Sequence, residues 1–226
     1  FEKPLVFTPG DNEWTDCHRT SNGSYQPLER LEKVRSIFFK EGLSLGQQAL
    51  RVQNQSTLMP TFGAYIENTR WLEQDVLFVT LHQVGSNNNL DHEIPGAMAE
   101  YTARNAANMA WLKNNFQFAK QKQTKAIIIA MQSDIFDARV PKESGFKDFI
   151  NNISQLAQSY KKPVLLIQGD SHQYVVDQPI KNTQGQTQEN IIRMIVPGAN
   201  LVEAVEVKVN TDKKDIKEVF SFKVYQ

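Results

Sequence analysis

This chain lacks the sequence features that indicate a membrane protein or a nucleic-acid-binding protein. No uninterrupted apolar run reaches the roughly 18 residues of a membrane-spanning helix. Neither sign of charge is in excess, because Lys and Arg total 25 and Asp and Glu also total 25. A zero net charge gives no electrostatic reason to expect a nucleic acid or an anionic membrane as partner. We therefore expect no membrane span and no nucleic-acid partner.

Cysteine and histidine are also scarce. The one cysteine, Cys17, is either an inert thiol or a residue whose disulfide partner lies outside these 226 residues. The histidines His18, His82, His92 and His172 are too widely spaced for a compact structural zinc motif.

The composition and the order of the residues predict a globular α/β chain. Hydrophobic residues make up 40% of the sequence, which is enough for a sizeable core. Short apolar runs alternate with amphipathic stretches, a pattern typical of an α/β sheet with crossover helices. Because no repeat or long linker interrupts this pattern, we predict one domain over residues 1–226.

Apolar periodicity predicts the individual elements. Extended segments are expected at 5–7, 64–71, 76–82, 126–131 and 164–167, and helices at 27–38, 98–116 and 146–160. The later runs IIRMIV, LVEAVEVKV and EVFSFKVY alternate apolar and polar residues. That alternation predicts an antiparallel sheet with one exposed face.

Polar clusters follow four of the apolar runs: GDNE at 10–13, VGSNNN at 84–89, QSD at 132–134 and GDSH at 169–172. Ligands of open α/β sheets bind beyond the carboxyl ends of the strands. We therefore expect these clusters to converge on one site.

The residue types in these clusters suit a metal. Asp11, Asp170 and His172 supply the oxygen and imidazole ligands that manganese, iron or zinc prefer, and Asn12, Gln132 and Asn87 can add carbonyl oxygens. Other interpretations stay open. An aspartate after glycine is often a cap or turn residue, and the Ser86–Asn89 run is either a phosphate-binding loop or a polar turn. His82 is either a core imidazole or a site residue.

The same residues resemble a known family. PLVFTPGDNEW resembles the P-x-x-x-x-P-G-N-H-[ED] segment of calcineurin-like metallophosphoesterases, and LLIQGDSH resembles their closing G-H-x-H segment. Gln132 in IIIAMQSD stands where these enzymes have a metal-binding histidine. FTPGDNEWTDCHR, PLERLEKVRSIFF, LHQVGSNN and GDSHQYVVDQP are similar to a divergent, largely uncharacterised secreted subgroup. The resemblance spans nearly the whole chain.

The resemblance implies an αββα sandwich of mixed sheets flanked by helices, in a secreted or periplasmic protein. Family members begin with strands that end in D-x-H and G-D, and neither motif precedes GDNE here. The resemblance thus implies that the first βαβ unit is missing from this chain, and that Cys17 is a half-cystine without its partner.

The resemblance also implies hydrolysis of a small phosphoester by two divalent metals (Mn, Fe or Zn) that activate a hydroxide. Position by position, Asp11, Gln132, Asp170 and His172 would be metal ligands, and Asn12 and His172 catalytic residues. Apart from the resemblance, the strand-end position of His82 and the polar run at 86–89 predict His82, Asn87 and Asn88 as substrate-binding residues.

Departures from the family motifs leave two functions open. Asn12 replaces a histidine and cannot act as a general acid near neutral pH, and Gln132 is a weaker metal ligand than imidazole. One hypothesis is a metal-dependent phosphoester hydrolase with a modified site. The other is a binding or structural protein of the same fold whose catalytic residues have eroded.

Overall fold

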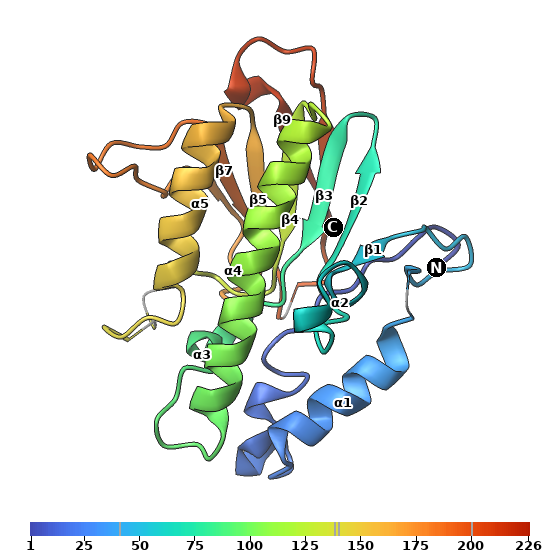
Figure 1. Cartoon of the computed structure of the whole chain (residues 1–226), viewed down its shortest axis with the longest axis vertical. Coiled ribbons are helices and arrows are strands. Elements are labelled where there is room, and N and C mark those ends of the chain that lie inside the picture. The colour runs from blue at the N-terminus through green and yellow to red at the C-terminus, as the bar shows by residue number, and fades with distance from the viewer. Residues whose placement is uncertain (41, 138, 140, 200) are drawn as a thin grey trace.

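The computed structural model describes residues 1–40, 42–137, 139, 141–199 and 201–226. They form a mixed α/β fold around a seven-stranded sheet of order β1-β2-β3-β4-β5-β7-β6 (Figure 1). The strands are β1 (Gln53–Asn54), β2 (Thr69–Glu73), β3 (Val76–Thr80), β4 (Ala126–Ala130), β5 (Val164–Gln168), β6 (Val175–Asp177) and β7 (Ile191–Ile195). The predicted α/β class is confirmed.

The centre of the sheet is parallel, since β3, β4, β5 and β7 run in the same direction. Their Val, Ile and Leu residues are buried nearly throughout, as expected for strands covered on both faces. One face is covered by the long helices α4 (Ala97–Gln121) and α5 (Lys147–Tyr160). Trp111, Phe116, Phe149 and Ile153 of these helices belong to the main hydrophobic core.

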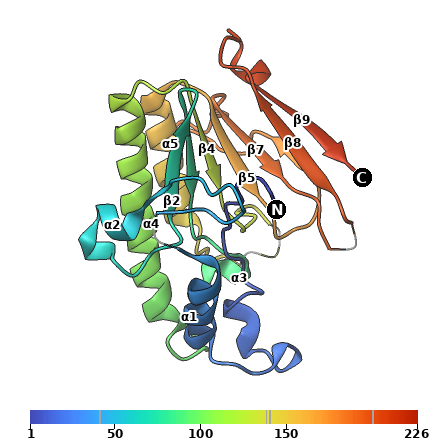
Figure 2. The same cartoon turned by 90° about the vertical axis from the view of Figure 1, so that its right-hand side faces the viewer.

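A two-stranded sheet packs against the other face (Figure 2). It is an antiparallel hairpin of β8 (Ala204–Val209) and β9 (Phe220–Tyr225), joined by the 3₁₀ turn η4 (Ile216–Glu218). The alternation in LVEAVEVKV and EVFSFKVY correctly predicted this hairpin. For IIRMIV the prediction holds only in part: β7 pairs antiparallel with β6 but in parallel with β5, and all five of its residues are buried, so the expected exposed face is wrong.

The N-terminal part carries shorter elements: η1 (Thr15–His18), η2 (Thr20–Asn22), α1 (Pro27–Phe38), α2 (Gln55–Leu58) and η3 (Pro60–Phe62). The α1 helix begins where Pro27 occupies its first turn and the Gln26 side chain accepts a hydrogen bond from the Leu28 N–H. The predicted strand at 5–7 is not formed. Among the described residues, Leu5 makes only an isolated bridge to Leu45, and no neighbouring strand continues it into a ladder.

The segment at 84–89 contains one short turn, α3 (Gly85–Asn88). Among the described residues, none of the helices is both long and apolar enough to cross a membrane.

Candidate functional site

The four predicted polar clusters meet at the carboxyl ends of β3, β4 and β5, where they surround a pocket of about 510 Å³. Asp11 comes from the N-terminal loop, Ser86 from the turn after β3, and Asp170 from the loop after β5. The predicted convergence is therefore confirmed. The pocket is lined by Asp11, Asn12, Asp16, Arg19, Ser86, Asn87, Leu90, Asp91, Asp134, Asp137, Arg139, Pro141, Phe146, Asp170 and His172.

Gln132 connects the two aspartates at the base of the pocket. Its amide Nε2 donates to Asp11 Oδ1 at 3.1 Å and to Asp170 Oδ1 at 3.3 Å. Its Oε1 accepts the Gly85 N–H at 2.6 Å, and this bond fixes which end of the amide faces the carboxylates. A neutral amide thus lies against both acids.

Gly85 shows how closely the carboxylates approach each other. A Cβ added to Gly85 would lie 2.3 Å from Asp11 Oδ2 and 2.6 Å from Asp170 Oδ1. Both oxygens would touch this one carbon, so the two carboxylates lie close to each other. Any side chain at position 85 would force the carboxylates apart. Glycine, which has no side chain, allows them to stay close.

The closeness of the acids changes their titration. Burial and the neighbouring charge of Asp11 raise the pKa of Asp170 to about 6. Arg139 acts in the opposite direction, but its Nη2 lies 3.7 Å from Asp170 Oδ2 and pairs more closely with Asp137 at 2.6 Å. Asp170 is thus only partly compensated by positive charge.

A second acidic group lines the same wall. Ser86 Oγ donates to Asp16 Oδ1 at 2.7 Å and lies 3.3 Å from Asp11 Oδ2. Arg19 pairs with Asp16 at 2.6 Å and donates to Ser86 Oγ at 3.2 Å. Burial raises the pKa of Asp16, and the charge of Asp11 adds to this.

The turn after β3 has an unusual backbone. Ser86, Asn87, Asn88 and Asn89 all have positive φ, between 48° and 59°. Asparagine tolerates this left-handed region better than most residues, which explains the Asn run. The turn directs Ser86 toward the acids.

Of the predicted substrate-binding residues Asn87 and Asn88, only Asn87 lines the pocket. Asn87 lines the pocket, but its amide is occupied by Leu90 O, Glu143 O and the Gly145 N–H. Asn88 is fully buried, does not line the pocket, and binds Gly145 O and Arg104. The prediction for Asn88 as a substrate contact is therefore wrong, because its amide fixes the turn from inside.

His82 is also a core residue. It is 0% exposed; its Nε2 accepts the Trp14 Nε1–H at 3.1 Å, and its Nδ1 is 2.6 Å from Glu67 Oε1. Because indole is only a donor, the proton lies on Nδ1 and both ring nitrogens are used. Of the two interpretations of His82, the structure supports the core imidazole, and the substrate-binding prediction is wrong.

The predicted catalytic residues Asn12 and His172 both line the pocket and are exposed. Asn12 follows Asp11 and donates its backbone N–H to Asp11 Oδ1 at 2.9 Å. His172 has a positive φ of 59°, and its ring packs against Gly198. Both positions give access to a bound ligand.

The metal prediction can be tested on the donor set. Asp11, Gln132 and Asp170 are together and His172 lines the same pocket, but Gln132 turns its N–H toward both acids and so offers a metal ion no lone pair there. Within the described part of the chain, no group of three or more His, Cys, Asp or Glu is placed to hold a metal ion. These residues do not fit a two-metal centre.

The sequence did not point to Asp16, Arg19 and Arg139 as pocket residues. Ser86 was expected near the site as part of the strand-end cluster at 84–89, and it does line the pocket. Asp16, Arg19 and Arg139 carry no such signal, because charged loop residues of this kind usually face solvent.

Cys17 is a buried free thiol, and its Sγ lies 3.7 Å from the Asn12 carbonyl oxygen. Burial raises its pKa, so the less reactive protonated form is favoured. This environment matches the inert interpretation; pairing with a cysteine outside the chain stays a prediction.

Comparison of the sequence with known family models and with curated proteins finds no match.

Proposed function

We propose that this chain is a binding protein whose pocket recognises the positively charged group of a small ligand, in particular an organic amine. The observation that carries the proposal is the close pair Asp11 and Asp170, which share one neutral amide. No ion pair to Asp11 is found among the described residues, and Asp170 has only the long contact to Arg139. A cation between these acids would relieve their mutual repulsion.

The charges around the pair favour a cation over a phosphate. Of the other acids of the wall, Asp16 pairs with Arg19, Asp137 with Arg139, and Asp134 with Arg193 at 2.8 Å. Asp91 has no cationic partner among the described residues, but its carboxylate accepts the backbone N–H groups of Glu93 and Ile94. Asp11 and Asp170 are therefore the acids that lie close together without a close cationic partner. An ammonium group supplies several N–H donors to such a pair without the strict geometry that a metal demands.

The test is calorimetric titration with 1,4-diaminobutane at pH 7.5 and low salt. We expect saturable binding that weakens at least tenfold in Asp11→Asn and in Asp170→Asn, because each removes one charge-assisted contact. Asp91→Asn is the matched control, since Asp91 lines the same pocket while its carboxylate caps the backbone at Glu93 and Ile94. Equal affinity in wild type and both site variants would refute the proposal.

Phosphoester hydrolysis is the second candidate. It is favoured by one observation, the convergence of Asp11, Gln132 and Asp170 at the end of the sheet where the resemblance implies the active site. The test is hydrolysis of bis(4-nitrophenyl) phosphate and 4-nitrophenyl phosphate with Mn²⁺ or Zn²⁺. Metal-dependent turnover that is lost in Asp170→Asn and kept in Asp91→Asn would establish this candidate in place of amine binding.

A further inference from the structure

A second, apolar cavity of about 220 Å³ lies on the opposite side of the sheet from α4 and α5. Its floor is formed by side chains of β2 to β5, among them Trp71 and Phe78, whose rings stack at 5.0 Å and 9°. One wall is β8, through Val207 and Val209, and another is the N-terminal segment, through Val6 and Thr8. The cavity is larger than the roughly 150 Å³ that holds a benzene molecule in an engineered core.

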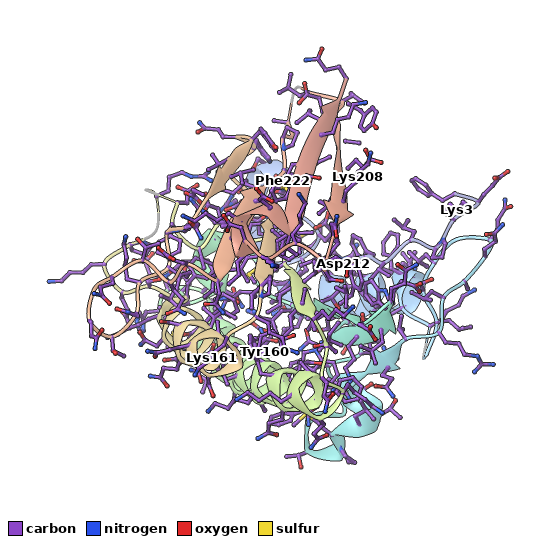
Figure 3. The ribbon with its side chains drawn as sticks, turned by 90° about the horizontal axis from the view of Figure 1, so that it is seen from above. Lys3, Tyr160, Lys161, Lys208, Asp212 and Phe222 are labelled. Carbon is purple, nitrogen blue, oxygen red and sulfur yellow. The ribbon has the colours of Figure 1, made fainter. Side chains whose placement is uncertain are left out.

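The strand beside this cavity has a free edge. β8 pairs only with β9 among the described strands. The Asn210 N–H is bonded to Val219 O at 2.8 Å in this register. Bonded and non-bonded pairs alternate in an antiparallel ladder, so Val207 and Val209 direct their N–H and C=O groups away from β9. Figure 3 shows Lys208 of β8 on the side of the hairpin that faces Lys3, and Phe222 of β9 on the other side.

The opposite wall is also unpaired. The segment 6–8 makes no backbone hydrogen bond within the described structure. The Thr8 hydroxyl is buried there without a partner, which costs free energy unless a partner is supplied. Unpaired backbone on both walls and an apolar floor together specify the shape and chemistry of an extended chain.

We propose that an extended peptide segment with apolar residues at alternate positions binds along the free edge of β8. Its backbone would continue the β8–β9 ladder, and its inward side chains would fill the cavity above Trp71 and Phe78. A peptide recognised in this way gains affinity from main-chain hydrogen bonds and selectivity from pockets for alternate side chains. This site is separate from the acidic pocket and does not depend on its proposed function.

The test uses a fluorescein-labelled peptide of about eight residues in which valine alternates with threonine. Anisotropy should show saturable binding to the whole chain. Two control peptides separate the sources of affinity: one has the same residues with the valines in a block, and one is N-methylated along one edge. Each should bind at least tenfold more weakly, because the first loses the alternation and the second loses the ladder.

Two variants locate the site. Ala130→Phe fills the cavity from its floor and should weaken binding at least tenfold. Lys208→Ala is the matched control, because Lys208 lies on the same strand with its side chain 72% exposed, and it should leave affinity unchanged. Circular dichroism checks that both variants are folded.

Hydrogen exchange on the wild-type chain provides an independent readout. The peptide should slow amide exchange at Val207 and Val209 and leave the amides of α4 unchanged. Absence of binding, equal binding of the control peptides, or exchange at β8 that the peptide does not slow would each overturn the proposal.

Discussion

At the scale of single residues, the acidic pair determines the behaviour of the pocket. Asp11 and Asp170 are kept close by Gln132 and by the absence of a side chain at Gly85. Such proximity is unfavourable for two carboxylates in the empty pocket and favourable once a cation is bound. The free energy that the pair costs in folding is therefore available for ligand recognition.

Asp170→Asn should stabilise the chain by about 1 kcal/mol at neutral pH, a value well below the full linkage energy because the carboxyl is partly solvated. The folded-state pKa of about 6 lies above the ordinary aspartate value of 3.8. The folded state thus binds the extra proton, and the free energy of unfolding falls as pH rises from about 4 to about 6. Urea unfolding across this range should show that loss in wild type and a smaller one in the variant. If Asp170→Asn were less stable than wild type at pH 7, the predicted stabilisation would be wrong.

Gly85→Ala should weaken amine binding at least tenfold and cost about 1–3 kcal/mol of stability, because the new methyl group overlaps both carboxylates. Gly63→Ala is the control: its nearest contact would be 3.3 Å and its φ is not positive. Calorimetry and thermal unfolding of the two variants make the comparison. Unchanged affinity in Gly85→Ala would show that the carboxylates need not be close.

The sequence was sufficient to select Asp11, Gln132 and Asp170, because strand-end position restricts where a side chain can point. It could not separate His82 and Asn88 from them. Both follow β3 in the same way, and only tertiary packing shows that Trp14, Glu67 and Arg104 occupy their polar atoms.

At the scale of elements, a buried polar network joins α1 to the sheet. Glu67 accepts two hydrogen bonds from Arg35 of α1, at 2.6 and 3.1 Å, and contacts His82 at the end of β3. Burial alone would raise the pKa of Glu67, but His82 and Arg35 lower it to about 2. The network holds the N-terminal loop with Asp11 against β3 through Trp14.

Glu67→Gln should destabilise the chain by about 3 kcal/mol at pH 7, since it removes the buried carboxylate that pairs with Arg35 and accepts the Nδ1–H of His82. The lowered pKa gives Glu67 a stabilising contribution that is complete above about pH 4.5 and is lost as pH falls toward 2. The difference between wild type and variant in urea unfolding should shrink below pH 4. The exposed pair Glu218–Lys213 offers a control, and Glu218→Gln should change stability by less than about 1 kcal/mol.

The long helices and the Val/Ile/Leu-rich strands β3, β4 and β5 were predictable, whereas the pairing of two other short runs was not. The α4 and α5 patterns repeat over several turns, so one apolar face is defined by many residues. The segment 5–7 and the run IIRMIV are too short for their periodicity to identify neighbours. Whether such a run becomes an isolated bridge or a central strand depends on which strands lie beside it.

At the scale of the whole molecule, the sheet carries two separate pockets of different chemistry. Its carboxyl end carries the acidic pocket, and the face away from α4 and α5 carries the apolar cavity under β8. The parallel core could be predicted from the βαβ pattern, and it places the strand-end loops together. The cavity could not be predicted, because it depends on how the β8–β9 hairpin sits on the sheet.

We propose that the acidic pocket recognises a cationic ligand and is not a two-metal hydrolytic centre. The most direct measurement is metal content by mass spectrometry after incubation with Mn²⁺ or Zn²⁺ and desalting, for wild type and Asp170→Asn. We expect less than about one equivalent to be retained in both proteins, because Gln132 turns its N–H toward the acids and offers a metal ion no lone pair there. About two equivalents retained by wild type and lost in the variant would contradict it.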